Sequence, residues 1–162
     1  MLPIAARSLS IAGNCGMSDC LFCQIVAGEI PSEKVYEDDR VLAFLDLYPL
    51  NRGHSLVVPK QHYESILEVP APLLEALAKA TQHVARALRR AYDLGGLNLL
   101  LNDGAYSGQL VPHVHFHVIP RTAGDGIHVP AGRQKYPHGE MTKVREEIVR
   151  ALSASGGGRD SP

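Results

Sequence analysis

Three histidines stand at alternate positions in the segment His113-Val114-His115-Phe116-His117-Val118-Ile119. Alternation with β-branched and aromatic residues predicts a β-strand. Because strand side chains alternate between faces, His113, His115 and His117 would form one row about 13 Å long, with the apolar residues facing a core. Imidazoles this close cannot all be charged without repulsion. The row therefore indicates either metal binding or chemistry at neutral pH.

The loop before this segment, Asn102 to Gln109, combines two side-chain amides with two glycines. Glycines let backbone N–H groups approach an anion closely, and amides donate hydrogen bonds without adding charge. Beside a histidine row, such a loop suits a phosphate group. The same composition is also typical of an ordinary turn, so the loop alone leaves both interpretations open.

Cys20 and Cys23 have the spacing of two thiolate ligands in a zinc knuckle, but one such pair supplies only half of a tetrahedral site. A redox pair and two free thiols are the competing interpretations. The chain has three cysteines and lacks a convincing signal sequence at its N-terminus. This usage favours a reducing compartment, and we expect the cytoplasm.

Composition restricts the class of protein. With 162 residues, 45% of them hydrophobic, and a net charge of −1, the chain fits one soluble domain and offers no electrostatic case for nucleic acid or an anionic membrane. No apolar run is long enough to span a bilayer. We expect residues 1–18 to be a disordered leader or an over-long start, 19–152 a single domain, and 153–162 a disordered tail.

The elements that must position these side chains follow from hydrophobic periodicity. Helices are predicted over Phe22–Ala27, Pro70–Tyr92 and Gly139–Leu152, and strands over Lys34–Glu37, Val41–Asp46, His54–Val58 and Leu97–Leu101, in addition to the histidine segment. The continuous apolar run of Leu97–Leu101 indicates burial on both faces. Strands grouped before and after one long helix predict an α+β fold with a mostly antiparallel sheet.

The chain also resembles a known family, the histidine triad (HIT) superfamily of nucleotide hydrolases and transferases. The similarity is carried by Gly108-Gln109 with the histidine segment, by residues 19–31, and by Phe44-Leu45-Asp46 together with residues 53–62, in all about residues 19–121. It implies a HIT-like fold, with about five antiparallel strands, one long packed helix and a C-terminal helix. It also implies a homodimer and a purine nucleotide substrate.

By this resemblance, His115 is the nucleophile that attacks the α-phosphate of a nucleotide conjugate, giving a histidine-nucleotidyl intermediate. A neutral imidazole is nucleophilic near pH 7, and its N–P bond is labile. His117 would hydrogen-bond the phosphate or the leaving group, and His54 would orient the site. Asn102 and Gln109 would hold the phosphate oxygens, where transition-state charge accumulates.

The resemblance further implies a nucleoside pocket and a zinc site. Asp46 would bind the ribose hydroxyls, because one carboxylate can accept from both. The pocket for the base would be lined by Phe44, Leu47, Leu56 and Ile25, which are apolar residues that equally suit a core. In a subset of the family, two histidines complete the cysteine pair. Here the resulting structural Zn²⁺ site would consist of Cys20, Cys23, His62 and His113.

One departure from the family's pattern leaves more than one leaving group possible. Leu110 occupies the position where the phosphoramidase branch typically has a serine that can hydrogen-bond the leaving group. The substrate is therefore either a nucleoside phosphoramidate or a dinucleoside polyphosphate. Two other classes remain: a catalytic metal centre in the histidine row, and a non-catalytic nucleotide-binding or scaffolding protein.

Overall fold

The structure is a computed structural model that describes residues 19–127 and 136–155. Contacts divide the chain into two units between Gly126 and Ile127. Where the second unit is described, at residue 127 and residues 136–155, it forms the helix α3 (Glu140–Ser155). The predicted leader lies outside the described residues, as does the predicted tail from residue 156 onward. The expectation that 19–152 form a single domain stays a prediction.

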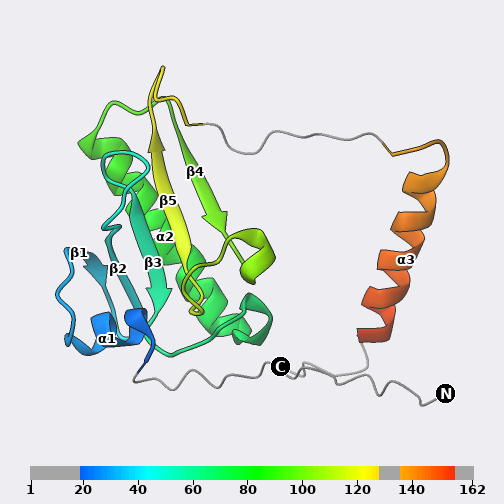
Figure 1. The fold of residues 1–162 in the computed structure, drawn as a ribbon, viewed down its shortest axis with the longest axis horizontal. Coiled ribbons are helices and arrows are strands. Elements are labelled where there is room, and N and C mark those ends of the chain that lie inside the picture. Colours follow the sequence, from blue (N-terminus) through cyan, green and yellow to red (C-terminus); the bar gives the residue numbers. More distant parts are fainter. Residues whose placement is uncertain (1–18, 128–135, 156–162) are drawn as a thin grey trace, which may run out of the picture. The chain divides into compact units, whose positions relative to one another are not determined.

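The first unit is built around a five-stranded, wholly antiparallel sheet (Figure 1). The strands are β1 (Lys34–Glu37), β2 (Val41–Leu45), β3 (Ser55–Pro59), β4 (Gly96–Leu101) and β5 (Phe116–Arg121), in the spatial order β1-β2-β3-β5-β4. The helices are α1 (Leu21–Ala27) and α2 (Ala71–Ala91), with short 3₁₀ turns η1 (Ile66–Glu68) and η2 (Ala105–Ser107). The α+β class and the five-stranded antiparallel sheet are confirmed.

Strand alternation gives the sheet two apolar faces. On one face, Val41, Ala43 and Val57 belong to a cluster with the buried stripe of α2. On the other face, the intervening residues of β2 and β3 pack with α1, in a cluster that consists of Cys20, Phe22, Ile25, Leu42, Phe44, Leu56 and Val58. The long helix and the short helix therefore cover opposite faces, and the short helix shares its face with the histidines.

The predicted burial of Leu97–Leu101 on both faces is wrong. β4 is half-buried along its length, and Leu99 is 52% exposed. The reason is its place in the sheet, because β4 is an edge strand paired only with β5. Leu97 and Leu101 pack against the α2 cluster, so only one face of the strand is covered. An apolar run cannot distinguish a central strand from a half-covered edge.

The predicted histidine strand is also too long at its start. Pairing of β5 with β3 begins at Phe116, opposite Val57, so residues 113–115 precede the ladder. The N–H of Val114 instead donates to the carbonyl of Tyr63 at 2.7 Å, in the loop after β3. The predicted alternation of faces nevertheless holds, because Val114 and Val118 lie in the α2 cluster while His113 contacts α1. In the described residues, no helix is long and apolar enough to cross a membrane.

Candidate active site and metal centre

The two cysteines and two histidines predicted as metal ligands converge on one point. The side chains of Cys20, Cys23, His62 and His113 each offer a ligand atom, and these atoms all lie within 4.8 Å of one another. His113 Nδ1 is 3.4 Å from Cys20 Sγ, 3.6 Å from Cys23 Sγ and 3.3 Å from His62 Nδ1. Usual zinc bond lengths place the corners of a tetrahedral site about 3.3–3.8 Å apart. The geometry therefore fits a closed, four-ligand zinc site.

The protonation of His113 also suits a metal ligand. Its Nε2 lies 2.9 Å from the carbonyl oxygen of Pro59. A carbonyl only accepts, so Nε2 carries the proton and Nδ1 presents a lone pair to the other three ligands. Burial lowers the pKa of His113 to about 4, against a smaller raising effect of that hydrogen bond. The imidazole is thus held neutral, with the lone pair of Nδ1 free to bind a metal.

In His115 a backbone carbonyl also fixes the tautomer, but the roles of Nδ1 and Nε2 are exchanged relative to His113. Its Nδ1 lies 2.7 Å from the backbone carbonyl oxygen of His113, so Nδ1 carries the proton and donates. Nε2 is left with its lone pair. The side chain is only 5% exposed, and burial lowers its pKa below the usual histidine range. His115 is therefore a neutral imidazole with a fixed tautomer, which is the state that a nucleophile needs.

A relay of hydrogen bonds fixes the other two histidines. The N–H of Leu50 donates to His54 Nδ1 at 3.2 Å, so the proton of His54 is on Nε2. That Nε2 lies 3.0 Å from His117 Nδ1 and donates to it. The proton of His117 consequently resides on its own Nε2, where it can be donated outward. Burial lowers the pKa of His117 to about 4, which keeps the ring neutral.

The Asp46 carboxylate borders this relay. Its Oδ2 is 3.5 Å from His54 Nδ1, a nitrogen that already accepts from a backbone N–H, so its effect on His54 is mainly electrostatic. Burial lowers the pKa of His54 more than Asp46 raises it. The other carboxylate oxygen accepts from the N–H of Tyr48 at 2.9 Å, which holds the side chain at the end of β2.

A glycine turn brings His54 to the relay. Gly53 has a φ of 86°, which L side chains rarely adopt, and a Cβ at this position would lie 3.0 Å from side-chain atoms of both Leu88 and Tyr92. Only glycine allows the chain to pass this close to α2 as it enters β3. The Asn51-Arg52-Gly53 turn recognised in the sequence therefore sets the depth at which His54 is buried.

The loop after β4 is braced rather than open. Gln109 Oε1 accepts from the N–H of Gly104 at 2.6 Å, and its Nε2 donates to the carbonyl of Glu64 at 2.9 Å. Asp103 accepts from the hydroxyl of Ser65 at 3.0 Å. The Gln109 amide thus shapes the loop instead of projecting from it. Asn102 is half-buried at the start of the loop. Its proposed contact with a phosphate stays a prediction.

The predicted base-lining residues divide into two groups. Phe44, Leu56 and Ile25 are 3%, 5% and 7% exposed and belong to the α1 cluster beside the histidines. Leu47 is 81% exposed, outside that cluster. Three of the four therefore act as core in this structure, and a role for any of them in base binding stays a prediction.

Comparison with known proteins decides the family. Residues 27–124 match the HIT domain model, which is more than half of the chain. The chain belongs to the HIT family. An uncharacterised HIT-like protein of Methanocaldococcus jannaschii is 46% identical over 129 residues, 80% of this chain and 98% of the relative. An adenylylsulfatase of Arabidopsis thaliana is 43% identical over 108 residues, 67% of this chain and 55% of the relative.

Solved HIT structures agree with the fold. A HIT family protein of Bacillus subtilis superposes with a TM-score of 0.77 at 38% identity, over 82% of this chain and 96% of that one. A zinc-bound histidine triad protein of Mycobacterium smegmatis gives 0.66 at 34% identity, over 86% and 99%. A histidine triad nucleotide-binding protein of Candida albicans gives 0.76 at 30% identity, over 84% and 99%.

Several contributors to this HIT site were not predicted. The carbonyl of Pro59, the N–H of Leu50 and the carbonyl of His113 fix three tautomers, and backbone groups leave no signal in residue types. The ring of Phe22, which contacts two of the histidines, was predicted only as part of a helix. Its position between Cys20 and Cys23 was the available signal.

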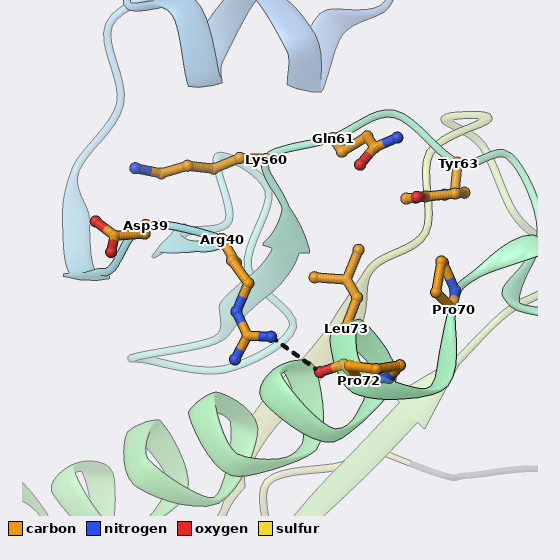
Figure 2. Close-up of a pocket in the computed structure, with 8 residues that line it drawn as sticks. All are labelled: Asp39, Arg40, Lys60, Gln61, Tyr63, Pro70, Pro72 and Leu73. Carbon is orange, nitrogen blue, oxygen red and sulfur yellow. Dashed lines mark hydrogen bonds between the residues drawn. The ribbon is translucent and has the colours of Figure 1, made fainter. Parts of the chain in front are cut away.

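Two surface grooves flank the loop after β3 in the HIT unit. One, of about 470 Å³, is lined by Asp39, Arg40, Lys60, Gln61, Tyr63, Pro70, Pro72 and Leu73, none of them a predicted site residue (Figure 2). There Arg40 Nη1 donates to the carbonyl of Pro72 at 3.2 Å. The second, of about 440 Å³, is lined in part by Cys23 and His62. The cysteine and histidine cluster thus borders this groove on the Cys23 side.

Proposed function

We propose that this HIT protein is a nucleotidyl hydrolase in which His115 attacks the α-phosphorus of a purine nucleotide conjugate. The observation that carries the proposal is the 2.7 Å hydrogen bond from His115 Nδ1 to the His113 carbonyl, which leaves Nε2 as a neutral nucleophile. HIT membership and the adenylylsulfatase among the relatives support nucleotide chemistry.

The proposed reaction has two steps. In the first, the bond from His115 Nε2 to phosphorus forms and the bond to the leaving group breaks, while the N–H of His117 Nε2 donates a hydrogen bond to the departing atom, which takes a proton from solvent. His115 keeps its Nδ1 proton, so the nucleotidylated ring is cationic and the His113 carbonyl stabilises it. In the second step, water attacks phosphorus, the N–P bond to His115 breaks, the proton of the water passes to solvent, and a nucleoside monophosphate leaves while His115 returns to its neutral form.

The remaining residues act around these two histidines. His54 holds the tautomer of His117 through the 3.0 Å hydrogen bond. We assign Asp46 to the ribose hydroxyls and Asn102 to the phosphate oxygens. Gln109 is assigned an indirect part, since its amide holds the loop through Gly104 and Glu64. Phe44, Leu56, Ile25 and Leu47 complete the proposed nucleoside pocket.

The cysteine and histidine quartet is assigned to zinc, supported by its spacing and by the zinc-bound relative. When bound, the ion would neutralise the thiolates and join α1 to the loop after β3 and to the segment before β5. With four protein ligands no position is open for water, so the proposed role is structural. Reduced thiols fit the proposed cytoplasmic location, and the half-exposed edge strand β4 supports a homodimer.

Non-catalytic nucleotide binding is the second candidate. Leu110 is 92% exposed and offers no hydrogen-bond donor to a leaving group, and the Gln109 side chain is already engaged within its loop. These two observations favour slow release of the leaving group. A binding protein would hold a purine mononucleotide tightly and turn over none of the candidate substrates.

The deciding experiment is a hydrolysis panel of adenosine phosphoramidates and dinucleoside polyphosphates on wild type, His115→Ala and His83→Ala. His83 lies on α2 against Tyr36 and serves as the matched histidine control. We expect turnover to fall by about 10³-fold or more in His115→Ala and to be unchanged in His83→Ala. An acid-labile adenylate should be trapped on wild type only. Tight binding without turnover in wild type would contradict hydrolysis.

A further inference from the structure

Phe22 stands where the metal centre and the proposed nucleophile meet. Its side chain is 5% exposed, and its ring centroid lies 5.2 Å from that of His115, 5.8 Å from that of His113 and 5.6 Å from that of Phe44. All three pairs are steeply inclined, at 70° to 80°. One aromatic residue therefore touches a proposed zinc ligand and the proposed nucleophile at the same time.

The orientation of His115 depends on such contacts because its backbone precedes the β5 ladder. Rotation of the imidazole by half a turn would exchange Nδ1 and Nε2 and break the hydrogen bond to His113. The ring of Phe22 stands nearly perpendicular to that of His115, and the ring of His117 lies 4.8 Å away at 66°. Packing from these two rings opposes the rotation.

The position of Phe22 is in turn set by α1. This helix has only seven residues, too few to be stable alone. Cys20 and Cys23 flank Phe22 in the sequence, and they attach α1 to the quartet. Their sulfur atoms lie 3.4 and 3.6 Å from His113 Nδ1. The apolar cluster beneath α1 completes its attachment.

We propose that Phe22 is a positioning residue for His115, held in place by the cysteines that flank it. This inference rests on the proposed function, because it assigns Phe22 a part in the orientation of the nucleophile. Phe22 does not act on the reacting atoms. It keeps the imidazole in the rotamer and tautomer that leave Nε2 free.

The test compares Phe22→Leu with Val26→Ala, a change on α1 that loosens the same apolar cluster without removing an aromatic ring. Phe22→Leu keeps apolar volume but removes the ring. We expect it to retain about one equivalent of zinc, to lower kcat about tenfold and to leave KM within about twofold. Val26→Ala should leave kcat unchanged. Phe22→Tyr, which keeps the ring, should restore most of the rate.

Nitrogen-15 NMR of the imidazoles provides a readout that does not depend on turnover. Wild type should show His115 as a single Nδ1–H tautomer, and Phe22→Leu should show a mixture. A kcat for Phe22→Leu equal to that of Val26→Ala, or a loss confined to KM, would overturn the proposal. If Phe22→Leu does not fold, Phe22→Met replaces it. If wild type hydrolyses nothing, the proposed function fails, and a single tautomer in the variant would then overturn the positioning role separately.

Discussion

The two halves of the histidine segment look alike in sequence but are held in different ways. Phe116–Arg121 is a strand paired with β4 along its whole length and with β3 from Phe116 to Val118. Residues 113–115 continue the same alternation of histidine and apolar residue without that pairing, and side-chain contacts hold them: the His113 ring in the quartet and Val114 in the core. The proposed nucleophile belongs to the half without pairing. The proposed chemistry is thus located where the sheet gives way to side-chain packing and to the proposed metal ligands.

Removal of the metal should separate the two halves most strongly. Without a metal, α1 and the loop after β3 keep only a ring contact of Phe22 and single hydrogen bonds to the segment around His113, whereas the β5 ladder keeps all of its backbone hydrogen bonds. We expect amide hydrogen exchange at Val114 and His115 to accelerate about a hundredfold, with Val118 changing by less than about threefold. Chelator-treated protein and Cys23→Ser should behave alike.

The control for this prediction is Cys15→Ser, a cysteine outside the quartet. It should retain zinc and the exchange pattern of wild type. Equal acceleration at Val114 and Val118 would mean that the metal stabilises the whole sheet rather than the segment before it.

Truncation of the two core valines should distinguish the halves energetically. Val114 and Val118 are 1% and 0% exposed and belong to the same cluster. A cavity costs more where the surroundings cannot relax. We expect Val118→Ala to lower the free energy of unfolding by about 2–3 kcal/mol and Val114→Ala by about 1 kcal/mol. Urea denaturation of zinc-loaded protein measures both, and equal losses would show that the two halves are equally rigid.

The same contrast shows which element bounds could be predicted from the sequence and which could not. Gly28 after a short apolar helix and the stripe from Leu73 to Leu88 are local patterns, and the helices appear within a few residues of their predicted bounds. The start of β5 is different. It depends on where β3 pairs with it and on the Tyr63 carbonyl that takes up the N–H of Val114. No pattern within 113–119 contains that information.

The candidate site was predictable to a similar degree. Residue types and the resemblance identified which histidines and cysteines meet. They could not identify the protonated nitrogen of each ring, because backbone groups of Leu50, Pro59 and His113 decide it. Exposure of Leu99 likewise depends on the strand order. These are non-local facts, and a structure is required to obtain them.

Acid should destabilise the paired half through His117. Its pKa is about 4 in the folded protein, because burial disfavours the charged ring and His115 and His54 add repulsion that Asp46 only partly offsets. The unfolded chain has a histidine pKa near 6.5 and so binds more protons between these values. This contribution to stability is therefore fully present above about pH 6.5 and is lost as the pH falls toward 4.

Urea unfolding of wild type and His117→Gln between pH 4 and 7 measures the effect. The free energy of unfolding should decline less steeply in the variant, by up to about one proton in the slope. Parallel curves would mean that His117 is not held neutral by burial. Because the pKa of His117 is about 4, the ring also stays neutral in the folded enzyme well below pH 6. We therefore expect no change in the hydrolysis rate from protonation of His117 between pH 7 and pH 6.

The smallest effect is expected at the far end of β5, where a side-chain anchor adds to a complete ladder. Arg121 Nε donates to Asp125 Oδ2 at 2.7 Å and Nη2 donates to Oδ1 at 2.8 Å, and the ion pair raises the pKa of Arg121. Backbone pairing of Arg121 with Gly96 remains when this pair is broken. We therefore expect Asp125→Asn to lower the free energy of unfolding by less than Val114→Ala does. A larger cost would show that side-chain anchors matter as much at the paired end as they do beside His115.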